Sequence, residues 1–145
     1  MYRLIKFNHA ITLQKFLKKK LKKGQKVFRY IFHKDEKDKD QLMMIWQKKN
    51  YYFPPKKFLD TQKLYFLNKG KLNIYIFNAS GKLLQTHKLS KDNPICKIKK
   101  NVYHADVAKS SYAIHCEVTA HSFRNRKIVF MNLKNESKIK QILIS

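Results

Sequence analysis

Cysteine is scarce in this chain of 145 residues, and its scarcity excludes a fold held together by disulfide bonds. Cys96 and Cys116 are the only two cysteines, and they do not form a Cys-x-x-Cys motif. Small secreted domains that rely on disulfides carry more cysteines at closer spacings. We therefore expect two reduced thiols in a cytoplasmic protein.

Glycine is equally rare, with Gly24, Gly70 and Gly81 as the only three. A Gly-rich phosphate-binding loop needs several glycines within a few residues, so this class of nucleotide site is excluded. No apolar stretch reaches the roughly 18 residues of a membrane-spanning helix, and we expect no signal peptide, because the N-terminus lacks its apolar core and its cleavage site of small residues. The length of the chain predicts a single domain that can bury a core without disulfides or metal.

Acidic residues number 9 against 33 basic residues, which gives a formal net charge of +24. Such a charge is common in proteins that bind nucleic acid. Arginine supplies much of base and phosphate recognition, yet the only arginines are Arg3, Arg29, Arg124 and Arg126. Two interpretations stay open. The lysines reflect coding-sequence bias on a solvated surface, or they serve an anionic partner, because lysine alone binds phosphate electrostatically.

The segment of residues 1–26 contains no acidic residue, and its apolar residues recur with helical spacing at Leu13, Phe16, Leu17 and Leu21. This pattern predicts a basic amphipathic helix that ends near Gly24. Its apolar stripe could pack on the rest of the protein. Alternatively, the helix could lie on an anionic membrane surface, where each lysine near the lipid contributes about 1 kcal/mol. A phosphate track for nucleic acid would have the same pattern.

Short alternating runs of apolar and polar residues fill residues 63–89, with breaks at residues 68–70 and 78–81, and the same rhythm returns in residues 94–118. Five or six strands this short, at intervals of roughly 8 to 12 residues, predict a closed or sandwiched antiparallel sheet. In particular, residues 72–89 should form a hairpin around the second break.

The segments on either side extend this β pattern. Residues 41–47 and 50–53 are predicted to be the first strands, after an exposed charged loop at residues 33–40. Residues 127–133 and 138–144 are apolar runs that we expect to pair as a C-terminal β-hairpin. This hairpin could cover a sheet edge in the same subunit or in a partner, so a homodimer stays open.

Three motifs in the β-rich region carry a resemblance to a known family. They are N-K-G-K-L-x-I-Y-I-F-N-x-S-G-K-L from residue 68, D-N-P-x-x-x-I from residue 92 and V-Y-H-A from residue 102. With them, the chain resembles small single-domain cupins of the WbuC type, which are associated with bacterial surface-polysaccharide (O-antigen) gene clusters. Upstream, Arg29, Phe32 and His33 lie where that family has R and LH, although Phe32 replaces a leucine. Residues 40–43 match its D-x-Q-R-M with a spacing one residue shorter.

The resemblance covers residues 27–123 and implies a mainly β fold. Its members are similar in forming a cupin-type β-barrel, or double-sheet jelly roll. We therefore expect this barrel between the basic N-terminal helix of residues 1–26 and the C-terminal hairpin extension of residues 124–145.

The resemblance also implies where a metal would bind in this barrel. Cupin metal sites use two histidines and a glutamate before a turn glycine, and one histidine from a later strand. Anchored on Gly70, the first three positions hold Lys56, Phe58 and Lys63, and only the last histidine is matched, by His104. Protonated lysine has no lone pair and phenylalanine cannot ligate. We therefore expect no metal and no cofactor.

The candidate site follows from the same comparison. Glu117 matches the glutamate of the family's closing L-E-V segment, which reads C-E-V here. If the strand pleat places them inside the barrel, His104 and Glu117 are the candidate catalytic residues. The candidate ligand-binding residues are Lys56, Lys63, Arg29, His33 and Tyr65. Such a pocket suits an anionic ligand, for instance a nucleotide-sugar phosphate or an acidic sugar. The alternative is an inactive barrel whose lysines reach out to its mouth.

The function implied by the resemblance is binding of a sugar or nucleotide sugar in surface-polysaccharide biosynthesis. An enzyme of this kind would be a metal-independent sugar isomerase or epimerase, because a histidine or glutamate can move a proton beside a carbonyl. The alternative is a basic nucleic-acid-binding module, with four tyrosines available for base stacking, namely Tyr51, Tyr52, Tyr75 and Tyr103. A peripheral position at the inner membrane, through the N-terminal helix, also stays open.

Overall fold

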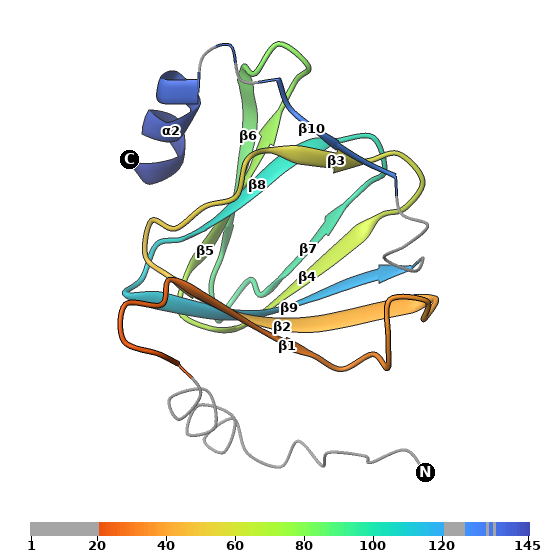
Figure 1. Cartoon of the computed structure of the whole chain (residues 1–145). Helices are drawn as coiled ribbons and strands as arrows, with labels where there is room; N and C mark the ends of the chain where they lie inside the picture. The colour runs from red at the N-terminus through yellow and green to blue at the C-terminus, as the bar shows by residue number, and fades with distance from the viewer. Residues whose placement is uncertain (1–20, 121–126, 133, 135) are drawn as a thin grey trace.

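Two five-stranded antiparallel sheets face each other in the computed structural model, which describes residues 21–120, 127–132, 134 and 136–145 (Figure 1). The first sheet has the order β1 (Val27–Ile31), β2 (Asp40–Lys48), β9 (Tyr112–Ala120), β4 (Lys63–Lys69), β7 (Ile95–Ile98). The second sheet has the order β10 (Ile128–Phe130), β3 (Lys56–Phe58), β8 (Tyr103–Ala108), β5 (Leu72–Phe77), β6 (Leu83–Leu89). The predicted mainly β, double-sheet jelly roll is therefore confirmed.

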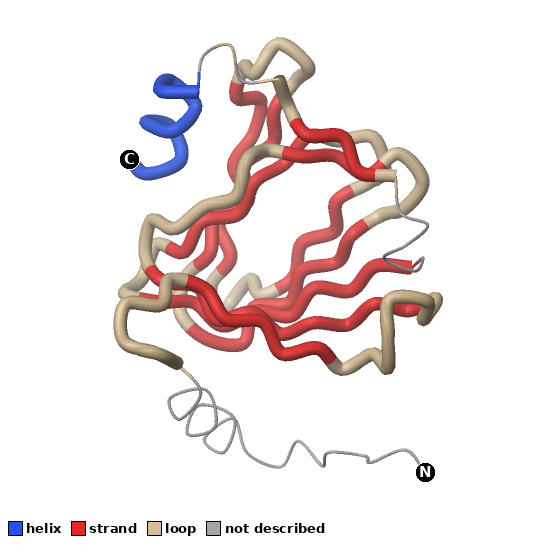
Figure 2. Tube along the Cα trace, in the orientation of Figure 1, coloured by secondary structure: helices blue, strands red, loops and turns tan. Residues whose placement is uncertain are grey.

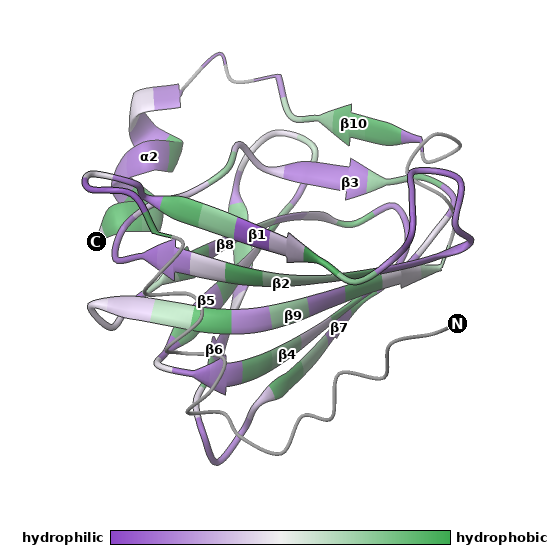
Figure 3. Cartoon of the chain, turned by 60° about the horizontal axis from the view of Figure 1, so that its bottom comes forward, coloured by the Kyte–Doolittle hydropathy of each residue, from purple (hydrophilic) through white to green (hydrophobic). Residues whose placement is uncertain are grey.

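Strand β4 shows how the sequence pattern places residues in the interior. Lys63, Tyr65 and Leu67 are buried between the sheets, whereas Leu64 and Phe66 are exposed. Side chains alternate along a strand, so one interior residue determines which of its neighbours share the same face. Hydrophilic and hydrophobic residues follow each other within single strands for this reason (Figure 3).

The hairpin predicted around residues 78–81 is confirmed, because β5 and β6 pair antiparallel on either side of this turn. Asn78 Oδ1 accepts hydrogen bonds from the backbone N–H groups of Ser80 and Lys82, at 3.1 and 2.9 Å. Gly81 takes a φ of 81°. An asparagine that hydrogen-bonds the backbone ahead of it, followed by a glycine, is typical of such turns.

The predicted C-terminal hairpin paired residues 127–133 with residues 138–144, and the structure differs in the second of these segments. The first half forms β10, which pairs with β3 at the edge of the second sheet. The second half is the helix α2 (Glu136–Ile144), so the predicted terminal hairpin is wrong (Figure 2). Ile139, Ile142 and Leu143 recur with helical spacing, but so short an apolar run is ambiguous between strand and helix.

Helix α2 covers the outer face of the second sheet. Ile139 and Leu143 are buried there in one apolar cluster with Tyr75 and Val107. Lys109 Nζ donates a hydrogen bond of 3.1 Å to the carbonyl oxygen of Leu143, in the last turn of the helix. This contact supplies a cation where the helix dipole favours one. Burial against the sheet therefore decides that this segment is helical.

Two predictions about the first strands also need correction. Residues 50–53 are not a full strand, and contribute only an isolated bridge between Tyr52 and Val107. Strands β1 and β3 were not predicted as strands. The predicted loop at residues 33–40 does connect β1 to β2, although its last residue, Asp40, already belongs to β2.

The predicted N-terminal helix falls almost wholly on residues 1–20, which lie outside the described residues, so it stays a prediction. The described residues 21–26 form a turn at Gly24 that leads into β1. Within the described part of the chain, no helix is long and apolar enough to cross a membrane.

Gly70 and Gly24 offer a matched pair of substitutions. Both have positive φ, 89° and 83°, which is unfavourable for any residue with a Cβ. A Cβ at Gly70 would also collide with the backbone oxygen of Tyr112 and with Ser110 Oγ, whereas nothing lies within 4 Å of a Cβ at Gly24. We expect Gly24→Ala to lower the free energy of unfolding by about 1 kcal/mol and Gly70→Ala by about 3 kcal/mol, measured by urea denaturation. Equal losses would contradict this.

Candidate functional site

A cavity of about 390 Å³ opens between the two sheets and is lined by residues of β1, β2, β4 and β9 on one side and β3, β8 and β10 on the other. Five predicted site residues line it, namely Arg29, His33, Lys56, Lys63 and Glu117. The other two, Tyr65 and His104, are buried beside it. The fold therefore brings the predicted residues together, from strands that are far apart in the sequence.

A larger depression of about 570 Å³ lies elsewhere, between the β5–β6 turn and α2. Its lining includes Lys82, Lys134 and Lys138 but none of the predicted site residues. The cavity between the sheets is therefore the candidate site.

A buried ion pair joins β4 to β9 at the inner end of the cavity. Lys63 Nζ lies 2.7 Å from Glu117 Oε2, and the two side chains are only 2% and 8% exposed. Lys63 also donates a hydrogen bond of 3.2 Å to the hydroxyl of Tyr65, which in turn donates one of 3.1 Å to Asp106 Oδ1. These four residues form one chain of polar contacts that crosses from the first sheet to the second.

The ionisation of this network follows from its burial and its pairing. Burial alone would raise the pKa of Glu117, but the positive charge of Lys63, with His115 and Lys56, outweighs it and holds the pKa well below its usual value. Burial, then the charge of Asp106, raises the pKa of the Tyr65 hydroxyl well above its usual value. Glu117 is therefore a carboxylate and Tyr65 a neutral hydrogen-bond donor.

Lys56 and Arg29 lie around the ring of Phe53 at the outer part of the cavity. The Arg29 guanidinium carbon is 4.5 Å from the centre of this ring, and Lys56 Nζ is 5.7 Å from it. Lys56 Nζ also lies 5.9 Å from the ring centre of Phe58. Burial, then the charge of Lys63, lowers the pKa of Lys56 to about 8. Lys56 therefore remains mostly charged at neutral pH, in surroundings that disfavour its charge.

His104 lies behind the cavity wall. Its ring centre is 5.9 Å from that of Phe58 and 6.2 Å from that of Tyr65. Nδ1 is 2.9 Å from the carbonyl oxygen of Val102, so this nitrogen carries the ring hydrogen and donates a hydrogen bond to that oxygen. Nε2 is buried without a hydrogen-bond partner. Burial, then the charge of Lys63, lowers the pKa of His104 to about 4, so the ring is neutral.

Asp106 and His115 belong to this site but were not among the predicted site residues. Asp106 follows His104 by two positions and His115 precedes Glu117 by two, so the period of a strand already places each on the interior face. Asp106 Oδ2 and both ring nitrogens of His115 are buried without a hydrogen-bond partner. His115 Nε2 lies 3.4 Å from Glu117 Oε1, without the geometry of a hydrogen bond.

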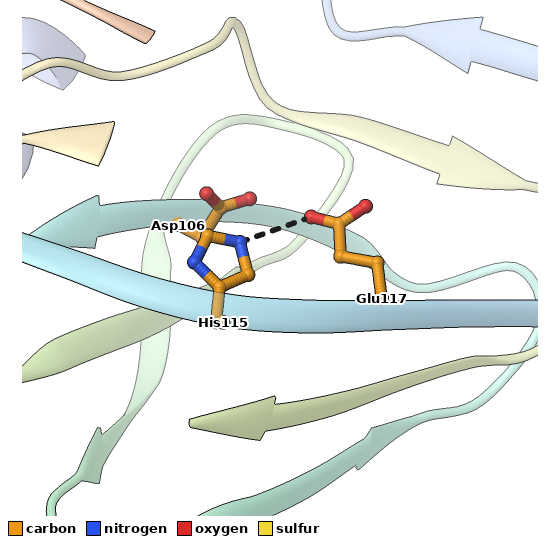
Figure 4. A group of neighbouring side chains, drawn as sticks. All are labelled: Asp106, His115 and Glu117. Carbon is orange, nitrogen blue, oxygen red and sulfur yellow. Dashed lines mark ion pairs between the residues drawn. The ribbon is translucent and has the colours of Figure 1, made fainter. Parts of the chain in front are cut away.

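Asp106, His115 and Glu117 form a group that could hold a metal ion, because one ligand atom of each lies within 4.8 Å of the others (Figure 4). None of these is at a position where the family motif places its first three ligands. Lys63 already contributes a positive charge 2.7 Å from Glu117. A divalent cation beside this ammonium would be repelled, so the group does not fit a metal while Lys63 is charged. The absence of a metal stays a prediction.

The comparisons with known proteins show the fold. No protein-family model matches the chain, and no curated protein matches it. Among solved structures, the capsular polysaccharide assembling protein CapF from Staphylococcus aureus superposes with a TM-score of 0.62 at 13% identity, over 72% of this chain and 29% of its own. Procruciferin, an 11S globulin from Brassica napus, superposes with a TM-score of 0.52 at 13% identity, over 63% of this chain and 22% of its own. The coconut allergen cocosin superposes with a TM-score of 0.53 at 9% identity, over 63% of this chain and 24% of its own.

The chain therefore has the cupin fold, a double-sheet jelly roll. It is structurally similar to CapF and to the 11S globulins, and spans less than a third of the length of each structure named above. At these identities, the likeness concerns the fold alone.

The ion pair of Lys63 and Glu117 leads to a stability prediction. Glu117→Gln leaves the Lys63 ammonium buried without a counter-charge, so we expect a loss of about 3 to 5 kcal/mol in the free energy of unfolding. Lys63→Met should cost a similar amount, because it leaves the Glu117 carboxylate buried without a counter-charge. The double variant should cost much less than the sum, as measured by urea denaturation in a double-mutant cycle. Additive losses would show that the two charges do not stabilise each other.

His104 leads to a prediction about pH. Its pKa of about 4 in the folded protein lies below the ordinary 6.5. Between these values the unfolded chain binds a proton that the folded chain does not, so the free energy of unfolding should fall as the pH drops from 6.5 to 4, by about 3 kcal/mol in all. His104→Gln should remove this part of the pH dependence, and His87→Gln should retain it. A pH profile unchanged by His104→Gln would contradict the assignment.

Proposed function

We propose that the cavity between the sheets binds a sugar or nucleotide sugar, without a metal, in a cytoplasmic step of surface-polysaccharide biosynthesis. The observation that carries this proposal is a cavity that combines paired charges with aromatic rings. A volume of about 390 Å³ lies within the range of small-molecule sites, roughly 300 to 1,000 Å³. It has room for one sugar ring with a group attached to it.

The lining matches the surface of a sugar. Phe53 and Phe58 offer apolar rings to the C–H faces of a sugar ring. Asp106 and Glu117 offer carboxylate oxygens to its hydroxyl groups, and Arg29 and Lys56 offer donors to an attached phosphate or carboxylate. These are a few polar groups at fixed positions in a partly apolar cavity, which is the usual composition of a specific site.

Two resemblances support the pathway part of the proposal. The motifs in residues 27–123 resemble cupins of the WbuC type. Independently, the backbone superposes on CapF, which is described as a capsular polysaccharide assembling protein. Both relatives belong to the synthesis of bacterial surface polysaccharides. This agreement supports a sugar as the ligand.

The ionisation states favour binding over catalysis. Glu117 has a pKa well below the usual value because Lys63 is paired with it, and a carboxylate of low pKa is a weak base. His104, the other candidate catalytic residue, is behind the cavity wall and contacts the rings of Phe58 and Tyr65. A metal-independent isomerase or epimerase is therefore our second choice within the same proposal.

Binding of nucleic acid remains an alternative that rests on the net charge of +24. Of the four tyrosines predicted to stack on bases, Tyr75 is buried in the cluster under α2 and does not face solvent. No described contact favours nucleic acid over a sugar. The homodimer and the anionic membrane surface also stay predictions.

A matched pair of tryptophan substitutions tests the proposed site. Ile31 lines the cavity and is 53% exposed, so Ile31→Trp should obstruct its mouth without disturbing the core. Leu84 is 61% exposed on β6, away from the cavity, and Leu84→Trp is the control. With a panel of nucleotide sugars measured by calorimetry, we expect Ile31→Trp to weaken binding about tenfold or more and Leu84→Trp to leave it unchanged. No binding by any member, or equal binding by both variants, would count against the proposal.

A further inference from the structure

The cavity has two ends of opposite character. Its inner end is formed by Asp106, Glu117 and Lys63, all buried, with exposed fractions of 5%, 6% and 2%. Its outer end has Arg29, which is exposed, and Lys56, which is partly buried. The charges at the two ends differ in sign, because the inner ion pair neutralises Lys63 and leaves Asp106 as the unpaired charge.

The inner end presents a hydrogen-bond acceptor that no protein group satisfies. Asp106 Oδ1 accepts from the hydroxyl of Tyr65, but Asp106 Oδ2 has no partner although the residue is buried. Glu117 Oε2 is already engaged by Lys63. Buried polar atoms are normally hydrogen-bonded, and a carboxylate oxygen can only accept. The inner end is therefore complementary to a neutral donor such as a hydroxyl group.

The outer end presents two cations on one aromatic ring. The Arg29 guanidinium and Lys56 Nζ lie 4.5 and 5.7 Å from the ring centre of Phe53. Each of them disfavours the charge of the other, and Arg29 contributes to the lowered pKa of Lys56. Both cations lie around one ring, and an anion that contacts both of them would be favourable to each. The guanidinium group is suited to bind a phosphate or carboxylate through two hydrogen bonds.

We propose that the ligand is a sugar that carries a phosphate or carboxylate at one end, bound with its hydroxyl groups toward Asp106 and its anionic group between Arg29 and Lys56. This inference rests on the proposed function and adds the ligand class and its direction. A neutral sugar would leave the two outer cations without a counter-charge. Inorganic phosphate, bound by the two outer cations, would leave Asp106 Oδ2 without a donor. Only a ligand with both groups satisfies both ends.

Calorimetry at fixed ionic strength tests this with four kinds of ligand: hexoses, the corresponding hexose 1-phosphates, hexuronic acids and inorganic phosphate. We expect the sugar phosphate or the uronic acid to bind about tenfold or more tightly than both the parent hexose and inorganic phosphate. Comparing the hexose 1-phosphates with the hexuronic acids shows which anionic group the outer end of the cavity binds. Inorganic phosphate that binds as tightly as the sugar phosphates would mean general attraction to a basic protein, and would overturn the inference.

Substitutions at the inner and the outer end of the cavity test the two ends separately. Lys56→Gln should weaken the anionic sugar about tenfold or more and leave the parent hexose unchanged, because the neutral sugar does not use this end. Asp106→Asn should weaken both sugars and spare inorganic phosphate. The matched control is Lys57→Gln, since Lys57 lies next to Lys56 on β3 but faces away from the cavity and contacts the ring of Tyr103 at 4.7 Å. If Asp106→Asn does not fold, the comparison of hexose phosphates with inorganic phosphate tests the inner end, and Arg29→Gln gives a second variant at the outer end, with the result expected for Lys56→Gln.

The pH dependence of binding gives a readout that a structural role for Lys56 would not produce. The charged groups facing Lys56 are Lys63 of β4, Glu117 of β9, Asp106 of β8 and Arg29 of β1. Because Lys56 loses its proton as the pH rises through about 8, affinity for the anionic sugar should fall across this range in the wild type. Lys56→Gln should show no such fall.

Two negative results have different meanings. If hexoses and their phosphates bind equally tightly and Lys56→Gln changes neither, this inference is wrong while the sugar-binding proposal stands. If neither the sugar phosphates, the uronic acids, the hexoses nor the nucleotide sugars bind, both are wrong.

Discussion

The interior of this jelly roll depends on the ion pair between Lys63 and Glu117. Two charged side chains can be buried at this position only because each supplies the other's counter-charge, and because Tyr65 takes a further hydrogen bond from Lys63. The pair joins residues 54 positions apart in the sequence, on adjacent strands of the first sheet. It fixes the ionised state of Glu117, keeps the cavity polar, and through Tyr65 orients Asp106 on the opposite sheet.

The same pair lies where the resemblance to cupins implies a metal ligand. Lysine occupies the position where that family places a glutamate ligand, and its ammonium lies against a glutamate of another strand. The interior thus contains a fixed cation that belongs to the chain. The fold is shared with CapF and the 11S globulins, but chemistry depends on the side chains that face the cavity and not on the architecture.

The charges in the cavity and those on the surface have different consequences. The net charge of +24 draws any anion toward the protein, without selecting among them. In the cavity, a few charges at fixed positions lie close to apolar rings, and Phe53 holds Arg29 and Lys56 at the outer end. Selection among anions can arise only from such an arrangement, since a partly desolvated cation gains more from a well-placed partner than an exposed one.

Most strands of the jelly roll could be predicted from the sequence, because the period of a strand is a local property, whereas the candidate site residues were predicted from the resemblance to cupins. Knowing that His104 and Glu117 face inward also places Asp106 and His115 inward.

Three features were decided only by the tertiary structure. Residues 138–144 became a helix because the outer face of the second sheet offered apolar residues to cover. The position of His104 behind Phe58 and Tyr65 depends on how the two sheets pack together, because these three rings come from strands of both sheets. The pairing of Lys63 with Glu117 depends on which strands become neighbours, and no local pattern determines a contact between strands so far apart in the chain.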